Sequence, residues 1–376
     1  MATQIEQYAA LAGDVDRELS WTEAELPETA RTKHVHRLHP YLGKFVPQLV
    51  EVFLGRHVRP GERVLDPFCG SGTTLVECST YGADAVGVDV SAFNALLARV
   101  KTSTPPAAEL EAVLAGALAA VAQADPADGD AGTPYLRDWF APRALAELLA
   151  FRDAIPADGG AAADAARVVL CRAARSARLA PHHRLESPTT PQRAPYWCHK
   201  HRRTCSPVGE AAKFLRRYAA DSARRLADYA ALRRAVDVRV LHGDAREADL
   251  GGPFDCLITS PPYPGRIDYH GQHRYAFELL GLPERRPDEI GAPARGLSRA
   301  AIAGYCDDAV RVLANARSRL RRGAAVVIVV DDARGLYDGI LESAGLELRE
   351  RRLRHVNRRT GRRDDGYLES VLVARV

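Results

Sequence analysis

The fold follows from one stretch, Arg63-Val-Leu-Asp-Pro-Phe-Cys-Gly-Ser-Gly-Thr-Thr74. Its first four residues have the character of a short buried strand, and its two glycines form a turn before a helix predicted over residues 72–81. A second strand is predicted over residues 85–89 and a second helix over residues 91–101. Strand, turn, helix, strand and helix within about 40 residues predict the opening of a parallel, doubly wound α/β sheet.

The two glycines of this turn, Gly70 and Gly72, do not belong to either of two common phosphate-binding turns. A dinucleotide-binding fingerprint needs a third glycine, which is missing because Leu75 follows, and a P-loop needs Gly-Lys-Ser or Gly-Lys-Thr. Glycine adopts backbone angles closed to other residues and lets a ligand approach the main chain. Such a turn also occurs in α/β proteins without a ligand there, so the turn alone does not identify the ligand.

Strand signals resume late in the chain. Residues 236–242 and 254–259 are predicted strands, and residues 324–330 are the longest apolar run. The last two strands are predicted near residues 346–354 and 367–373, close enough in sequence to form a terminal hairpin.

The middle of the chain, residues 102–235, lacks strand signals. Ala-rich helical patterns run to about residue 180, a Pro-, His- and Arg-rich loop covers residues 181–207, and a basic helix is predicted over residues 209–234. A further helix, over residues 46–58, precedes the first strand, since its apolar residues recur at helical spacing.

The composition is that of a folded globular protein: of 376 residues, 46% are hydrophobic and 27% are charged. The longest apolar run is much shorter than the roughly 20 residues of a bilayer-spanning helix. The acidic N-terminus lacks a signal-peptide pattern, so we expect a cytoplasmic protein with no membrane partner. Seven scattered cysteines, an odd number, are expected to be mostly reduced thiols.

The positive charge is concentrated in two stretches. Residues 172–234 hold 15 Lys and Arg against 4 Asp and Glu, and residues 349–363 hold 8 Arg against 1 Glu. Because the formal net charge of the chain is only +4, the rest of the chain is acidic. A single run of this kind is commonly a solvated helix face, but two runs on an acidic body favour binding to a polyanion such as nucleic acid.

A second string, Thr259-Ser-Pro-Pro-Tyr263, follows the predicted strand over residues 254–259. Its two prolines fix the backbone and lack N–H groups, while their carbonyls remain as acceptors. The Ser260 hydroxyl and the Pro261 carbonyl can each accept an N–H from an exocyclic amine, which favours a pyramidal nitrogen. Tyr263 can stack on a flipped base. A Pro-Pro loop with a packed tyrosine is the structural alternative, and the glycine turn in the same sheet argues against it.

Together, the two strings resemble those of the bacterial site-specific DNA methyltransferases that modify exocyclic amines, cytosine N4 or adenine N6. The resemblance covers roughly residues 34–101 and 236–376. It implies a Rossmann-like α/β methyltransferase fold, with a doubly wound, mostly parallel sheet, a C-terminal hairpin and a largely helical insertion. The implied domains are residues 1–101, the N-terminal segment and first part of the methyltransferase domain; residues 102–235, the basic insertion; and residues 236–376, the second part.

The resemblance also implies S-adenosylmethionine as the cofactor. The glycine turn would wrap the methionine part of the cofactor. Asp89, which ends the next strand, would accept hydrogen bonds from the ribose hydroxyls. Asp244, which follows the strand over residues 236–242, would approach the amine of the cofactor's adenine. An upstream segment, residues 39–47, would close over the cofactor carboxylate. The expected cofactor-binding residues are Lys44, Phe45, Asp66, Phe68, Gly70, Gly72, Thr73, Asp89 and Asp244.

The expected catalytic residues are Ser260, Pro261, Pro262 and Tyr263. Members of this family with serine at the first position of the string are mostly cytosine-N4 enzymes, whereas adenine-N6 enzymes more often carry Asp or Asn. Ser260 therefore favours cytosine N4, with adenine N6 and an RNA base as alternatives. A catalytically silent nucleic-acid-binding module is the competing class of function, and the intact string argues against it.

The insertion is the expected target-recognition region. The glycine turn precedes the Ser-Pro-Pro-Tyr string in this chain, the reverse of the order in many cytosine-N4 enzymes. Double-stranded DNA is the expected partner, a cognate restriction endonuclease is compatible with the family, and the oligomeric state stays open. Tyr196 and Trp197 can stack on bases or anchor the loop to the core, and we favour the anchor. The residues expected to contact DNA are Arg193, Lys200, Arg202, Arg203, Arg358 and Arg359.

Three residues of the insertion, Cys198, His201 and Cys205, offer zinc ligands, with His182 or Cys171 as a fourth. Their spacing is unusual, and no second C-x-x-C half accompanies them. The sequence therefore favours a basic DNA-contacting loop with reduced cysteines and no metal.

Overall fold

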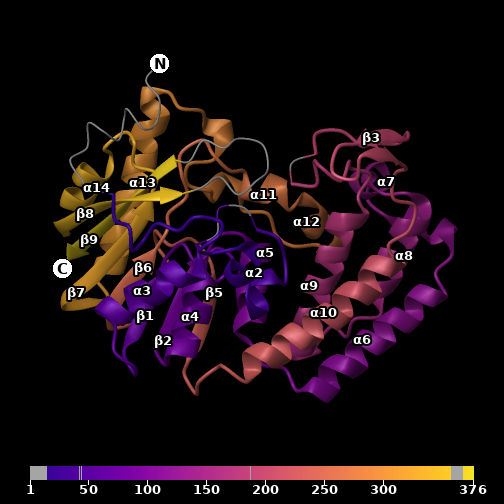
Figure 1. Ribbon diagram of the computed structural model, residues 1–376, viewed down its shortest axis with the longest axis horizontal. Coiled ribbons are helices and arrows are strands. Elements are labelled where there is room, and N and C mark those ends of the chain that lie inside the picture. Colours follow the sequence, from indigo (N-terminus) through magenta and orange to yellow (C-terminus); the bar gives the residue numbers. More distant parts are fainter. Residues whose placement is uncertain (1–14, 42, 44, 187, 357–366) are drawn as a thin grey trace.

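A computed structural model describes residues 15–41, 43, 45–186, 188–356 and 367–376 (Figure 1). The described residues form a seven-stranded sheet of strands β1 (Arg63–Asp66), β2 (Asp84–Asp89), β5 (Val238–His242), β6 (Phe254–Thr259), β7 (Leu320–Val330), β8 (Glu347–Val356) and β9 (Tyr367–Arg375). Their order across the sheet is β5-β2-β1-β6-β7-β9-β8.

Most strands of the sheet are parallel. Strand β1 pairs in parallel with β2 and β6, β2 with β5, and β6 with β7, whereas β9 is antiparallel to both β7 and β8. The predicted terminal hairpin is thus confirmed, with its second strand inserted next to β7. Each predicted strand of the sheet forms close to its expected bounds, and β7 starts earlier, at Leu320. The predicted doubly wound, mostly parallel fold is confirmed.

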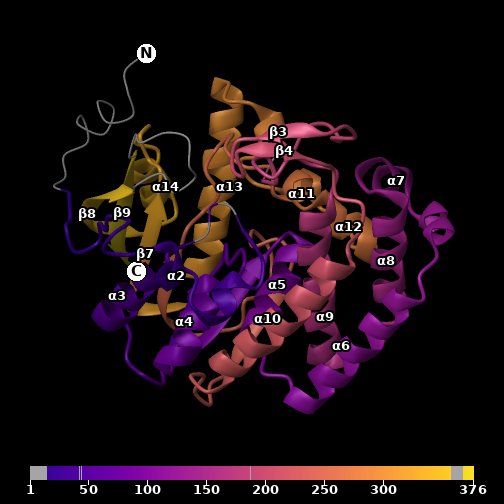
Figure 2. The same ribbon diagram turned by 45° about the vertical axis from the view of Figure 1, so that its right-hand side comes forward.

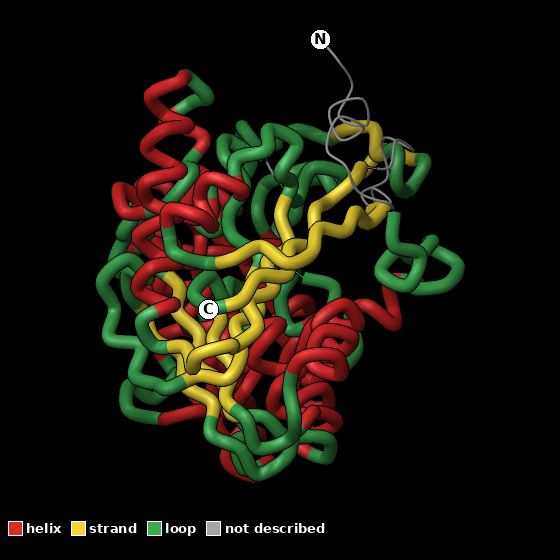
Figure 3. Tube along the Cα trace, turned by 90° about the vertical axis from the view of Figure 1, so that its left-hand side faces the viewer, coloured by secondary structure: helices red, strands yellow, loops and turns green. Residues whose placement is uncertain are grey.

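Helices cover both faces of the sheet (Figures 1 and 3). One face packs against α13 and α14, and the other against α3, α4 and α5. The bounds of these helices are α3 (Pro47–His57), α4 (Thr73–Tyr81), α5 (Ala92–Thr102), α13 (Arg299–Arg317) and α14 (Tyr337–Ser343).

The apolar run in β7 follows from this layering. Val326 and Ile328 join the core under α13 and α14, while Val327 and Val329 join the core under α3 and α4. A central parallel strand is buried on both faces, so its sequence has no polar side.

The chain between β2 and β5 builds a helical body beside the sheet (Figure 1). Its core is continuous with α5, which contributes Phe93 and Leu97, and with α12 (Arg274–Leu280), which contributes Tyr275 and Phe277. The insertion therefore packs on elements of the methyltransferase-like part, and its role in target recognition stays a prediction. Its helices are α6 (Ala107–Ala122), α7 (Pro134–Trp139), α8 (Pro142–Asp153), α9 (Gly160–Ala177) and α10 (Ala212–Ala230); two short helices elsewhere are α2 (Glu28–Arg31) and α11 (Tyr269–Gln272).

A two-stranded hairpin, β3 (Tyr196–Cys198) and β4 (Arg203–Cys205), stands out from this body (Figure 2). The expectation of a loop without strands there was wrong, because strands of three residues are too short to show an alternating pattern. Tyr196 makes a contact within the loop itself, because its hydroxyl accepts the backbone N–H of His182 at 3.0 Å, and the expected anchor to the core stays a prediction for it. The anchor is wrong for Trp197, which is 56% exposed.

The described part of the second basic stretch lies in β8, where its arginines are paired within the fold. Arg354 donates to Glu369 at 2.8 Å in a buried pair, and Arg352 donates to Asp16 at 2.8 Å. These ion pairs hold the sheet edge to its neighbours, and binding of a polyanion by this stretch stays a prediction. Among the helices that the structure describes, none combines the length and the apolar character needed to cross a bilayer.

Candidate active site

The candidate site lies at the carboxyl ends of β1, β2 and β6. The chain leaves β1 toward β2 on one side, and β6 lies on the other side, so this is the point at which the strand order reverses. Open α/β sheets bind ligands in the crevice at such a point. A cavity of about 820 Å³, its mouth included, opens there.

The two motifs meet in a single hydrogen bond. Thr259 at the end of β6 donates its hydroxyl to the Asp66 carboxylate at the end of β1, over 2.6 Å. The same carboxylate oxygen accepts the backbone N–H of Phe68 at 3.1 Å. Burial raises the pKa of Asp66 to about 6, against the opposing effect of the Thr259 bond. The hydrogen bond fixes the glycine turn relative to the Ser-Pro-Pro-Tyr corner.

The two glycines of the turn have different surroundings. Gly70 has a φ of +50°, lines the cavity, and a Cβ there would lie 3.2 Å from the Tyr41 hydroxyl. Gly72 has a φ of +79° and faces α5, where a Cβ would come within 2.9 Å of the Ala98 side chain. Gly72 is thus required by helix packing and is not among the residues that line the cavity.

Asp89, at the end of β2, lines the cavity beside the glycine turn. Its carboxylate accepts the backbone N–H of Gly70 at 3.0 Å, the backbone N–H of Ser91 at 2.8 Å, and the Asn94 amide at 3.1 Å. Burial raises the pKa of Asp89 to about 6, although these hydrogen bonds oppose the shift. A carboxylate has about four acceptor sites, so one remains for a ligand in the cavity.

Asp244, after β5, also lines the cavity but has a strong internal partner. Arg246 donates to both of its carboxylate oxygens, with the shortest contact at 2.6 Å, and also pairs with Asp308 at 2.6 Å. Burial raises the pKa of Asp244, but the hydrogen bonds from Arg246 outweigh it and the net pKa is lowered. The predicted contact of Asp244 with the adenine amine would have to share these oxygens with Arg246.

The charge of the cavity fits S-adenosylmethionine, which carries a cationic sulfonium. Its described lining holds the acids Asp66, Asp89, Asp244, Asp288 and Glu289 and no lysine, arginine or histidine. A nucleotide polyphosphate would meet repulsion from such a wall, whereas a cation is attracted. Apolar surface for an adenine ring comes from Phe68, Val90 and Ile290.

Some lining residues were not predicted from the sequence. Tyr41 lies within the quoted segment 39–47, and its hydroxyl accepts the Asn94 amide at 3.0 Å. Glu289 accepts the backbone N–H of Tyr269 at 2.9 Å and pairs with the buried His270 at 2.9 Å, which holds α11 against the cavity. No motif marks residue 289, because its position depends on the loop before α13.

The catalytic string divides between the cavity and its surroundings. Ser260 and Pro262 line the cavity, while Pro261 and Tyr263 are not among its lining residues. The Pro262 carbonyl accepts the Tyr305 hydroxyl at 3.1 Å, and the Tyr263 hydroxyl donates to Glu369 at 2.9 Å. Within the described part of the chain, no donor or acceptor is hydrogen-bonded to the Ser260 hydroxyl, and none to the Pro261 carbonyl.

The residues expected to contact DNA differ in their surroundings. Lys200, Arg202 and Arg203 lie exposed on the β3–β4 hairpin. Arg193 is exposed but forms an ion pair with Asp138. Three further predicted residues lie outside the described residues: Lys44 of the cofactor set, and Arg358 and Arg359 of the DNA set.

Of the predicted cofactor-binding residues that the structure describes, all except Gly72 line one cavity: Phe45, Asp66, Phe68, Gly70, Thr73, Asp89 and Asp244. Ser260 and Pro262 line it too, so the two motifs open into a common space. The arrangement can hold a cation at the glycine turn and present the Ser260 hydroxyl to an amine beside it.

Comparisons with known proteins agree on a family. The N6_N4_Mtase model, described as DNA methylase, matches residues 6–98. The Type II methyltransferase M.MjaII of Methanocaldococcus jannaschii is 32% identical over 429 aligned residues, covering 92% of this chain and 81% of the relative. The Type II methyltransferase M.MvaI of Kocuria varians is 37% identical over 71 residues, 18% of this chain and 16% of the relative.

The solved structures add little to this assignment. The rRNA methyltransferase aviRa from Streptomyces viridochromogenes aligns over 94% of this chain and 95% of its own, with a TM-score of 0.35 and 15% identity. A likeness this loose carries no argument about function, so the family rests on the sequence relatives. On those relatives, the chain belongs to the N6/N4 family of DNA methyltransferases, which use S-adenosylmethionine as the methyl donor.

Proposed function

We propose that this enzyme methylates N4 of cytosine in duplex DNA. The observation that carries the proposal is the Ser-Pro-Pro-Tyr corner. Its Ser260 hydroxyl borders the cofactor cavity, and both this hydroxyl and the adjacent Pro261 carbonyl lack a partner among the described residues. Serine at this position is also the residue that favours cytosine N4 in the family.

In this proposal the chain holds and orients the amine. The Ser260 hydroxyl and the Pro261 carbonyl each accept one N–H, which turns the nitrogen lone pair toward the cavity. S-adenosylmethionine, when bound, supplies a methyl group made electrophilic by the sulfonium. The bond from Thr259 to Asp66 keeps the amine corner and the glycine turn in fixed relation. Alignment of this kind is worth several kcal/mol when reacting atoms are about 3–3.5 Å apart.

Tyr263 is proposed as the stacking surface for the flipped base. Its hydroxyl donates to Glu369 of β9, which fixes the tilt of the ring. Stacking on an aromatic ring is worth about 1–3 kcal/mol per base. The amine becomes acidic once methylated, so it can lose its proton late and no strong general base is needed.

Product analysis tests the proposed base. Duplex DNA incubated with the enzyme and S-adenosylmethionine, then digested to nucleosides, should contain N4-methylcytosine by mass spectrometry and no N6-methyladenine. N6-methyladenine alone would make the cytosine assignment wrong. Structured RNA serves as the competing substrate, and failure to bind S-adenosylmethionine by calorimetry would favour the catalytically silent module.

The β3–β4 hairpin is proposed to contact the DNA backbone. Replacing Arg202 and Arg203 together by alanine should lower DNA affinity and flatten its salt dependence, because each lost phosphate contact removes about 0.9 from the log–log slope. Methyl transfer at saturating DNA should change little. Arg349→Ala/Arg352→Ala, which removes two exposed arginines paired within β8 and to Asp16, should keep the wild-type slope. An unchanged slope in the hairpin variant would contradict the contact.

The family relative also supports a biological setting. M.MjaII is named a Type II methyltransferase, which supports our proposal that this chain acts in a modification system of that type in the cytoplasm. A cognate restriction endonuclease remains the expected partner of such a system.

A further inference from the structure

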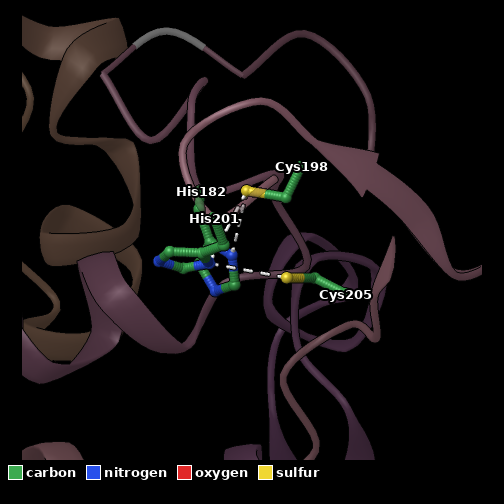
Figure 4. A group of neighbouring side chains, drawn as sticks. All are labelled: His182, Cys198, His201 and Cys205. Carbon is green, nitrogen blue, oxygen red and sulfur yellow. Dashed lines mark hydrogen bonds between the residues drawn. The ribbon is translucent and has the colours of Figure 1, made fainter. Parts of the chain in front are cut away.

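Four side chains of types that can ligate a metal converge at the β3–β4 hairpin (Figure 4). Cys198 ends β3, Cys205 ends β4, and His201 lies in the turn between them. His182 reaches the same point from the loop after α9, which is distant in sequence. All four ligand atoms lie within 4.8 Å of one another. The sequence left the fourth ligand open between His182 and Cys171, and Cys171 is buried instead within the helical core.

Three nitrogen–sulfur distances among these atoms match those of a tetrahedral zinc shell. His201 Nδ1 lies 3.6 Å from Cys198 Sγ and 3.4 Å from Cys205 Sγ, and His182 Nδ1 lies 3.8 Å from Cys198 Sγ. A tetrahedral zinc ion with Zn–S near 2.3 Å and Zn–N near 2.0–2.1 Å places neighbouring sulfur and nitrogen ligands about 3.6 Å apart. The imidazoles are tilted by 61° with centroids 4.7 Å apart, so both nitrogens can face a common centre.

The backbone holds the ligands in this arrangement. The His201 N–H donates to the Cys198 carbonyl at 3.2 Å, which closes the turn that brings the two side chains together. The Tyr196 hydroxyl lies 2.9 Å from His182 Nδ1 and also accepts the His182 backbone N–H at 3.0 Å. When His182 Nδ1 binds a metal instead of the Tyr196 hydroxyl, the hydrogen bond from the His182 backbone N–H still holds Tyr196 in place.

This segment has almost no apolar core of its own. Among the described residues from 181 to 207, the buried side chains are those of Cys198 and Cys205 alone. Short segments with too little core are commonly stabilised by a structural metal. Two thiolates and two neutral imidazoles balance the charge of Zn²⁺, so the ion would add no net charge beside Lys200 and Arg202.

We propose that His182, Cys198, His201 and Cys205 bind one structural Zn²⁺ ion. The metal ties the hairpin to the loop after α9 and so fixes the hairpin that carries Trp197, Lys200 and Arg203. Thiolate and imidazole ligands together select zinc over the harder cations Mg²⁺ and Ca²⁺. This replaces the metal-free loop that the sequence favoured. The proposal is independent of the base that the enzyme methylates, because it concerns the metal content of the chain.

Metal analysis of the full chain, purified without chelators, tests the site. Wild-type protein should contain about one zinc per chain, and the variants Cys198→Ser, Cys205→Ser and His182→Ala should each lose most of it. His199→Ala, in the same turn, and Cys306→Ser, in α13, are matched controls and should keep the metal. Co²⁺ added to metal-stripped wild type should give the absorption bands of tetrahedral thiolate ligation, a readout that does not depend on how well a variant folds.

Three results would overturn the proposal. One is wild-type protein without zinc that also gives no thiolate–Co²⁺ bands. A second is zinc that persists at full content in both cysteine variants, which would put the metal elsewhere, for example at the cluster of His34, His36 and Glu77. A third is a disulfide between Cys198 and Cys205 in protein kept under reducing conditions.

Discussion

Ser260→Ala should slow methyl transfer by about a hundredfold in single turnover, with cofactor affinity and duplex affinity nearly unchanged. The hydroxyl matters most as the amine becomes pyramidal, so its loss affects the transition state more than the bound state. Removing one preorganised polar partner of a reacting group typically costs roughly 10²–10³ in rate. Rapid-quench transfer of a labelled methyl group at saturating DNA measures the rate directly.

The control for this variant is Ser318→Ala, which changes an exposed serine at the end of α13 whose hydroxyl donates to the Asn315 carbonyl. It should transfer methyl groups at the wild-type rate. A wild-type rate in Ser260→Ala as well would mean that the amine is held elsewhere. A large loss of cofactor affinity in Ser260→Ala would instead assign this serine to the cofactor, because it lines the same cavity.

The sheet and the pairing of the two motifs could be predicted because their signals are local. The strand-ending positions of Asp66, Asp89 and Thr259 follow from apolar runs that stop at a turn. Parallel strands then bring their carboxyl ends to one edge of the sheet. The topology of the sheet determines which strand ends become neighbours. The hydrogen bond from Thr259 to Asp66 therefore could not be predicted from the sequence.

The features that sequence reasoning missed depend on partners distant in the chain. The ion pairs of Arg352 with Asp16 and of Arg354 with Glu369 could not be predicted, because only the fold brings these acids beside β8. His182 joins Cys198 and Cys205 across a loop whose path no local pattern predicts. Charge runs and ligand spacings therefore indicate what a segment can bind. Tertiary contacts determine whether its charged and metal-ligating side chains remain available for binding.

Asp89→Asn should weaken S-adenosylmethionine binding roughly ten- to hundredfold, the range expected when one hydrogen bond to a charged group, about 1.5–3 kcal/mol, is lost. Titration calorimetry at pH 7.5 measures the change. Asp84→Asn is the matched control, since Asp84 begins the strand that Asp89 ends and its carboxylate accepts the backbone N–H of Asp237. Equal dissociation constants in wild type and Asp89→Asn would contradict the proposed cofactor role.

The pH dependence of the same binding gives a second readout with a defined sign. Burial raises the pKa of both Asp66 and Asp89 to about 6, so lowering the pH from 7 to 5 protonates them in the free enzyme. Neutral carboxyls attract a cation less, and the affinity should fall by about tenfold for each group. The α-amino and α-carboxyl groups of the cofactor titrate near 8 and 3.5, outside this window. Asp89→Asn should remove one of the two steps.

Unfolding of the protein at low pH does not explain this pH dependence of cofactor affinity. A carboxyl whose pKa is raised above its unfolded value of 3.8 favours the folded state at low pH, and that contribution is lost as the pH rises through about 6. Acidification from pH 7 to 5 should therefore raise the contribution of Asp66 and Asp89 to the free energy of unfolding, while it weakens cofactor binding. Parallel unfolding and binding measurements separate the two effects. Affinity independent of pH between 5 and 7 would mean that neither carboxylate faces the cation.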